Sequence, residues 1–281
     1  MKKVAIVTDS TADLPLSYYE GHEVFMVPLV VRFGEESHKD WIEMPPSRFY
    51  QRLRSSSILP KTSQPSVADF AETYRKLASQ HEHIVSVHLS SKLSGTVQSA
   101  EIASQEVDVP VTIVDTKLAS LGTGMVLDAL VEARDGGADG KEIADLAWDI
   151  SGRVKILFTV GTLKYLEMGG RIGKAQALVG SLLNIKPLLT LQDGIVIPYK
   201  KIKGTRRVYE EMVAFLKQNI GGGGLLHLGL AHADYPAAIV RLKKMIEEAG
   251  IKPSILIESE VGAVIGTYTG PDSFAIMFHE E

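Results

Sequence analysis

Short, mostly apolar runs rich in valine and isoleucine recur along the first half of the chain. Their apolar residues do not alternate strictly with polar ones, which predicts strands that are buried on both faces of a sheet. The predicted strands are residues 4–8, 24–31, 84–89 and 111–114.

Helical spacing fills the intervals between these strands. Phe70, Tyr74 and Leu77 fall at i, i+4 and i+7, on one face of a helix. Ser66 and Asp69 have the spacing of a capping box at its start. Two more helical patterns follow, one after residue 121 and one over residues 143–150. Strands that alternate with helices predict an α/β unit with a mainly parallel sheet.

The pattern changes after about residue 154. Asp193-Gly194 lies between two apolar runs and predicts a β-hairpin, so the second half is expected to contain a mixed sheet. We therefore predict an α/β protein of two domains, residues 1–152 and 153–281, with a ligand between them. The other predicted elements are strands 156–160, 188–191, 195–199, 226–231, 255–260 and 274–278 and helices 207–219 and 235–249.

Composition narrows the classes of function. The 281 residues carry a net charge of −4, which argues against a general nucleic-acid binder, and their length favours two domains. The chain has no cysteine, which excludes disulfides, thiolate metal sites and a cysteine nucleophile. No stretch approaches the ~18 apolar residues of a membrane span. We expect a cytoplasmic protein without a transmembrane segment.

The sequence does not match the common motifs for nucleotide binding, nucleophilic catalysis or metal binding. The segment 170–175 resembles a phosphate-binding loop, but Met168 and Ala175 replace residues that a Walker loop requires. Ser94 lacks the flanking glycines of a nucleophile elbow, and Gly122-Thr123-Gly124 lacks the third glycine of a dinucleotide fingerprint. His81 and His83 have no carboxylate cluster around them, so no metal site is predicted.

Hydroxyl side chains concentrate in three loops, two that follow predicted strands and one that precedes a predicted helix. These loops are Asp9-Ser10-Thr11, Thr62-Ser63-Gln64-Pro65-Ser66 and the segment 90–96. Each one alone is explained by helix capping or turn formation. Together on one edge of a parallel sheet, however, they favour a pocket for a carboxylate or phosphate. None of them brings a base, which favours binding over catalysis.

Six segments in this order resemble motifs of the DegV family. Each is weak alone, but the series runs along nearly the whole chain. The segments are Asp9-Ser10-Thr11-Ala12-Asp13-Leu14-Pro15, Thr62-Ser63-Gln64-Pro65-Ser66, Leu89-Ser90-Ser91-Lys92-Leu93-Ser94-Gly95-Thr96, residues 163–173, Lys186-Pro187-Leu188 and residues 266–271.

The resemblance implies a two-domain protein that holds a long-chain fatty acid in a tunnel between its domains. It implies no catalysis by the chain itself and no cofactor besides the bound fatty acid, which a separate fatty acid kinase converts to the acyl phosphate. The family residues that hydrogen-bond the carboxylate match Thr62 and Ser94, and we place Ser63, Gly95 and Tyr268 beside them. Candidate tunnel residues, which are equally compatible with ordinary core, are Phe158, Leu163, Met168, Ile172, Leu178 and Leu182.

Two positions depart from the family pattern. Tyr268 stands where the family usually has histidine, and a tyrosine can still donate one hydrogen bond to a carboxylate. Asp272 stands where the family usually has glycine. Its negative charge would oppose a nearby carboxylate unless it faces solvent or pairs with a base.

A basic run covers residues 200–207, with five cations in eight residues. The plain explanation is a solvated loop before a helix. The resemblance instead favours a docking face for the kinase, with Arg206, Arg207, Lys203 and Arg171 as its candidates. Nucleic acid is disfavoured because no aromatic side chains interleave with the charges.

The leading hypothesis is thus a fatty-acid carrier. The alternative is a small-molecule kinase or hydrolase related to dihydroxyacetone kinase domains. That alternative requires a nucleotide-binding loop or a paired base and nucleophile, and the motifs above supply neither.

Overall fold

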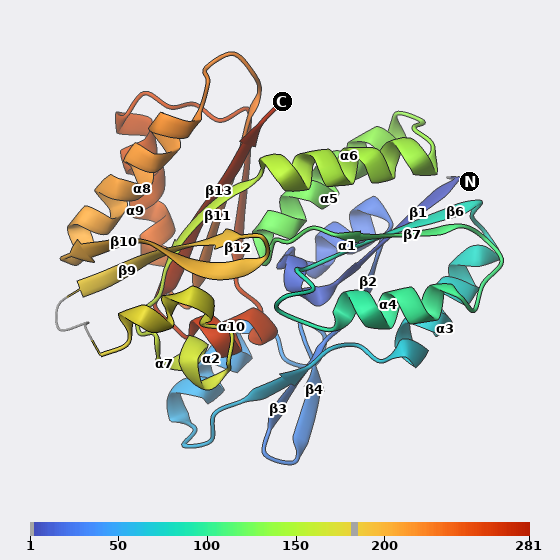
Figure 1. The fold of residues 1–281 in the computed structure, drawn as a ribbon, viewed down its shortest axis with the longest axis horizontal. Coiled ribbons are helices and arrows are strands. Elements are labelled where there is room, and N and C mark those ends of the chain that lie inside the picture. The colour runs from blue at the N-terminus through green and yellow to red at the C-terminus, as the bar shows by residue number, and fades with distance from the viewer. Residues whose placement is uncertain (1–2, 181–184) are drawn as a thin grey trace.

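The computed structural model describes residues 3–180 and 185–281 (Figure 1). Its first sheet is parallel throughout, as predicted. Helices cover both of its faces: α3 (Val67–Ala78) and α4 (Thr96–Ser104) on one, α5 (Leu121–Asp135) and α6 (Gly140–Arg153) on the other. The strand order is β2 (Val24–Val27), β1 (Val4–Asp9), β6 (His83–His88) and β7 (Val111–Asp115).

Alternate residues of β1 pack on opposite faces, which explains its continuous apolar pattern. Ala5 and Val7 pack with α3 and α4, whereas Val4 and Ile6 pack with α5 and α6. The predicted capping box is confirmed, since Ser66 Oγ accepts from Asp69 N at 3.2 Å.

The single strand predicted over residues 24–31 is wrong. The chain leaves the parallel sheet at Pro28, which has no N–H to donate to a ladder. The second part, β3 (Val30–Phe33), instead enters a small antiparallel sheet with β4 (Glu36–Lys39) and β5 (Lys61–Ser63). The helices α1 (Leu16–His22) and α2 (Pro46–Ser55) and the short turn η1 (Ser10–Ala12) complete this half.

The second large sheet is mixed, as predicted. Its only parallel pair among the described residues joins β11 to β12. Asp193 and Gly194 have φ values of 50° and 78°, the left-handed turn that an Asp-Gly hairpin requires. The strand order is β10 (Ile195–Lys203), β9 (Ile185–Gln192), β8 (Lys155–Thr159), β13 (Ser273–Glu280), β11 (Leu226–Ala233) and β12 (Ile255–Glu260).

Helices α8 (Thr205–Asn219) and α9 (Pro236–Glu248) cover the outer face of this sheet, the one turned away from the first half of the chain (Figure 1). Near the inner face lie α7 (Lys164–Met168), η2 (Gly173–Leu178) and α10 (Ala263–Thr269). Within the described part of the chain, no helix is both long and apolar enough to cross a bilayer.

Helix α5 packs against both large sheets. A Cβ atom at Gly229 of β11 would lie 2.9 Å from Met125 Sδ, so a larger residue there would push the Met125 side chain aside. One continuous hydrophobic core extends from Val4 in β1 to Met277 in β13. The predicted division after residue 152 falls one residue before α6 ends at Arg153, and its position stays a prediction.

Candidate functional site

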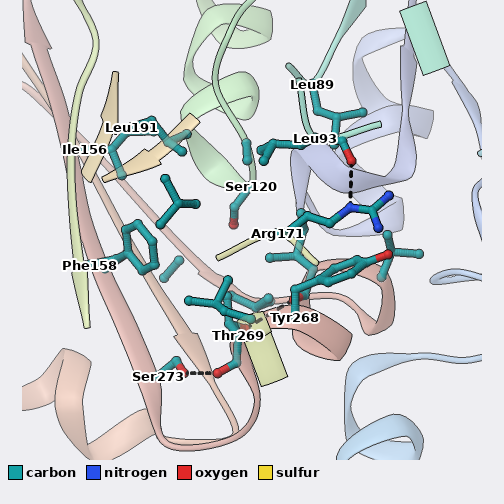
Figure 2. Close-up of a pocket in the computed structure, with 18 of the residues that line it drawn as sticks. Leu89, Leu93, Ser120, Ile156, Phe158, Arg171, Leu191, Tyr268, Thr269 and Ser273 are labelled. Carbon is teal, nitrogen blue, oxygen red and sulfur yellow. Dashed lines mark hydrogen bonds between the residues drawn. The ribbon is translucent and has the colours of Figure 1, made fainter. Parts of the chain in front are cut away.

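A cavity of about 340 Å³ lies where the two halves of the chain meet. Residues from β5, from the loops that follow β6 and β7, and from β8, β11, β13 and α10 form its wall. Most of the lining side chains are apolar (Figure 2). Such a cavity suits a ligand with a long apolar part.

Hydroxyl groups gather at one part of this wall. Thr62 Oγ1 on β5 lies 2.5 Å from Tyr268 Oη on α10, and Ser63 and Ser94 line the same cavity. Ser94 Oγ is 2.8 Å from Thr96 Oγ1. The structure thus brings together four of the five residues predicted to surround a carboxylate.

The fifth residue, Gly95, lies behind the wall. It is the N-cap of α4, and a Cβ atom there would lie 2.5 Å from the side-chain amide of Gln64. A larger residue here would require the Gln64 side chain to move away from the loop that carries Ser94. Gly95 supports the site and does not line it.

Arg171 lines the cavity, although the sequence placed it among the docking residues. Its Nε donates to Leu93 O at 3.0 Å and its Nη1 donates to Gly169 O at 2.9 Å. The guanidinium carbon lies 5.0 Å from the centre of the Tyr268 ring. These contacts place Arg171 on the cavity wall beside Tyr268 (Figure 2), and its part in docking stays a prediction.

Of the tunnel candidates, Phe158 lies on the cavity wall. Met168 is 61% exposed, and its assignment to the tunnel is wrong. Leu166 of α7 faces the cavity, and a residue two positions later points to the opposite side of a helix. Leu163, Ile172 and Leu178 are buried in an adjacent core cluster, and Leu182 lies outside the described residues.

Sequence reasoning missed the strand residues of the far wall. Ala231 on β11 and Ala275 and Met277 on β13 line the cavity. Two alanines on neighbouring central strands leave room that larger side chains would fill. The alanines can be read from the sequence, but their meaning depends on knowing that Ala231 pairs with Ala275 in neighbouring strands.

Two buried carboxyl groups from the first half hold the start of α10. Asp13 Oδ1 accepts from Gly262 N and Asp40 Oδ1 accepts from Ala263 N, both at 2.9 Å. Burial raises the pKa of Asp13 well above its usual range and raises the pKa of Asp40 to about 7. Tyr50 Oη also donates to Val261 O at 2.9 Å. These bonds fix the helix that places Tyr268 opposite Thr62.

Asp272 is directed to a base and not to the cavity. Its carboxylate accepts from Arg54 Nη2 at 3.3 Å, and its side chain is 56% exposed. Arg54 also donates to Asp234 at 2.6 Å. The departure from the family glycine therefore does not add charge to the hydroxyl-lined part of the wall.

Ser86, His88 and Asp9 have the connectivity of a hydrolase triad. Ser86 Oγ lies 2.7 Å from His88 Nε2, and His88 Nδ1 lies 2.9 Å from Asp9 Oδ2. All three residues are fully buried, however, and none of them lines the cavity. Tyr74 Oη also donates to Ser86 Oγ at 2.8 Å. The triad is a buried polar network that no substrate reaches, so it does not support the hydrolase alternative.

The basic run lies on the surface, at the end of β10 and the start of α8. Lys200 pairs with Glu211 at 2.7 Å, and Arg206 pairs with Glu210 at 3.0 Å. Lys203 and Arg207 are exposed. None of these cations lines the cavity. Among the residues that the structure describes, no cluster of three or more histidine and acidic side chains could hold a metal ion.

Comparisons with known proteins agree with this architecture. The model of a family described as "Uncharacterised protein, DegV family" matches residues 3–281. A protein of Thermotoga maritima named fatty acid-binding protein is 38% identical over 278 residues, 96% of this chain and 95% of the relative. The structure of a DegV family protein from Thermus thermophilus, described as showing fatty acid binding, is 35% identical with a TM-score of 0.95 and covers 99% of this chain and 100% of that chain.

A third relative is the structure of a stearic acid-binding protein from Eubacterium ventriosum. It is 26% identical, has a TM-score of 0.89, and covers 100% of this chain and 98% of its own. These matches extend over both halves and every part of the cavity wall. The chain therefore belongs to the DegV family.

Proposed function

We propose that this protein binds one long-chain fatty acid in the cavity and presents its carboxylate to a separate kinase. The observation that carries the proposal is the pairing of Thr62 with Tyr268 on a largely apolar wall that Ser94 also lines. Relatives named for fatty acid binding support the same ligand class.

The energetics suit a lipid. A chain of over a dozen methylenes, at ~0.8 kcal/mol for each buried CH₂, gains roughly 10 kcal/mol on transfer from water. The entropy cost of binding removes several kcal/mol of that gain. Apolar area then sets most of the affinity, and hydroxyl groups are sufficient to orient the carboxylate.

The second part of the proposal concerns the partner. The exposed basic run lies apart from the cavity, so an acidic surface of a kinase can contact it without occupying the lipid site. In this account the chain supplies a bound acyl group, and phosphoryl transfer takes place on the partner. The cytoplasm, where ATP-dependent kinases act, is the compartment we propose.

Organic extraction of the purified protein tests the ligand class. We expect a long-chain fatty acid in the extract, close to one molecule per chain. A protein that yields no fatty acid and that also fails to bind added palmitic or oleic acid would overturn the proposal.

A further inference from the structure

Ser120 is a polar residue on the cavity wall that the carboxylate assignment does not use. It lies between Leu93 and Arg171 on one side and Ile156, Phe158 and Leu191 on the other, and it lines the cavity (Figure 2). With the carboxylate at the Thr62–Tyr268 pair, as proposed above, we expect the apolar part of the bound chain to pass this hydroxyl group.

The hydrogen bonding of Ser120 differs from that of the other hydroxyl groups nearby. Thr159 Oγ1 donates to Pro187 O and Ser273 Oγ donates to Thr269 O, both at 2.8 Å, so these groups are bonded to backbone carbonyls. Ser120 Oγ instead donates to the carboxyl group of Asp13 at 2.6 Å. All three hydroxyl groups keep lone pairs that can accept a further hydrogen bond, but only Ser120 has a titratable carboxyl group as its partner in place of a carbonyl.

The bond to Asp13 makes the Ser120 hydroxyl adaptable. When Asp13 is ionised, the charge-assisted bond polarises Ser120 Oγ and strengthens it as an acceptor. When Asp13 holds a proton, which its burial favours, the carboxyl group can donate to Ser120, and Ser120 can then donate to the cavity. In both protonation states of Asp13, Ser120 can therefore form one more hydrogen bond with a group inside the cavity. It accepts that bond when Asp13 is ionised and can donate it when Asp13 is protonated.

The backbone at this position suggests a useful variant. Ser120 has φ 55° and ψ −148°, a conformation that glycine adopts more readily than serine. Replacement by glycine therefore removes the hydroxyl group without adding backbone strain.

We propose that Ser120 binds a hydroxyl group carried part-way along an acyl chain, so that the cavity accepts hydroxylated long-chain fatty acids as well as unsubstituted ones. This inference rests on the proposed function and specifies its ligand class further. Without such a partner, a hydroxyl group buried against apolar side chains loses its bonds to water, and binding weakens accordingly.

The test compares stearic acid with a series of monohydroxystearic acids that differ in hydroxyl position. Affinities are measured for the wild type, Ser120→Gly and the control Ser273→Ala, whose lost hydroxyl also lies on the cavity wall. We expect the wild type to bind at least one mid-chain isomer about as tightly as stearic acid. Ser120→Gly should weaken binding of that isomer about tenfold or more relative to binding of stearic acid. Ser273→Ala should leave the ratio of the two affinities unchanged.

Two results would overturn the inference. One is that the wild type binds every hydroxystearic acid more weakly than stearic acid, and by a similar factor. This measurement does not depend on how any variant folds. The other is an affinity ratio that stays the same in Ser120→Gly. A wild type that binds neither stearic acid nor any hydroxy acid would instead contradict the proposed function itself.

Discussion

Thr62 Oγ1 and Tyr268 Oη lie 2.5 Å apart and join the small sheet of the first half to α10 of the second. Two hydroxyl groups in one hydrogen bond have two protons, and the bond between them uses one. The other proton remains available to a ligand. The pair therefore acts as one donor to the proposed carboxylate, whichever residue presents it.

This sharing predicts non-additive effects of mutation. Thr62→Val or Tyr268→Phe leaves one hydroxyl group with its proton free, so each single variant should weaken fatty-acid binding by about 1 kcal/mol. The double variant should lose more than the sum, because no donor remains. Titration calorimetry measures the affinity of the wild type, the two single variants and the double variant for palmitic acid. Tyr199→Phe is a surface control. A double variant that binds like the wild type would place the carboxylate elsewhere.

A histidine at position 268 should make fatty-acid binding depend on pH. An imidazole titrates between about pH 5.5 and 8. Tyr268→His should therefore introduce a step in fatty-acid affinity within that interval, relative to the wild type measured in the same buffers. If both proteins give the same profile, residue 268 does not face the headgroup.

Asp40 should make the protein less stable as the pH rises. Burial raises its folded-state pKa from 3.8 to about 7, so the folded protein holds a proton that the unfolded chain has lost between these values. Because of this group, the free energy of unfolding should fall by up to about 4 kcal/mol through this interval. Above the interval it should level off.

Asp40→Asn isolates this contribution, since an amide does not ionise in this range. Urea denaturation of both proteins from pH 4 to 8 should show a flatter profile for the variant. Parallel profiles for wild type and variant would mean that Asp40 is ionised in the folded state throughout.

The basic run should affect the kinase reaction and not lipid binding. Arg206→Glu, or the milder Arg207→Ala, should slow acyl-phosphate formation by the cognate kinase, because both side chains are exposed and lie apart from the cavity. Salt should reduce the wild-type rate toward that of the variants, since screening acts over ~8–10 Å.

Lys244→Ala is a matched control, as Lys244 is an exposed cation that pairs with Glu248 on α9. If the run is only a solvated surface at the end of β10 and the start of α8, all four proteins will react at the same rate at every salt concentration. Loss of fatty-acid binding in Arg206→Glu would contradict the separation of lipid site and docking face.

Local sequence patterns predict much of this fold because local physics determines it. Continuous apolar runs correspond to β1, β6 and β7, and the Asp193-Gly194 pair marks the β9–β10 hairpin. The break at Pro28 was predictable in principle, since proline cannot extend a central ladder, yet its apolar neighbours conceal it.

The site is less accessible to sequence reasoning, because its wall depends on long-range contacts. The hydroxyl loops around Thr62 and Ser94 are recognisable, but the inward course of Arg171 depends on Leu93 O, 78 residues earlier. Likewise, the carboxyl groups of Asp13 and Asp40 bind α10 from more than 200 residues away. No local pattern encodes these pairings.

The most direct test of the central claim is to fill the cavity. Ala275→Phe places a bulky side chain on its far wall, and Ala237→Phe adds the same side chain at an exposed position of α9. Native mass spectrometry after delipidation and reloading with oleic acid measures the bound ligand in each folded variant. We predict one fatty acid per chain in the wild type and in Ala237→Phe, and little or none in Ala275→Phe. Full loading of a folded Ala275→Phe would show that the fatty acid binds outside this cavity and would contradict the account.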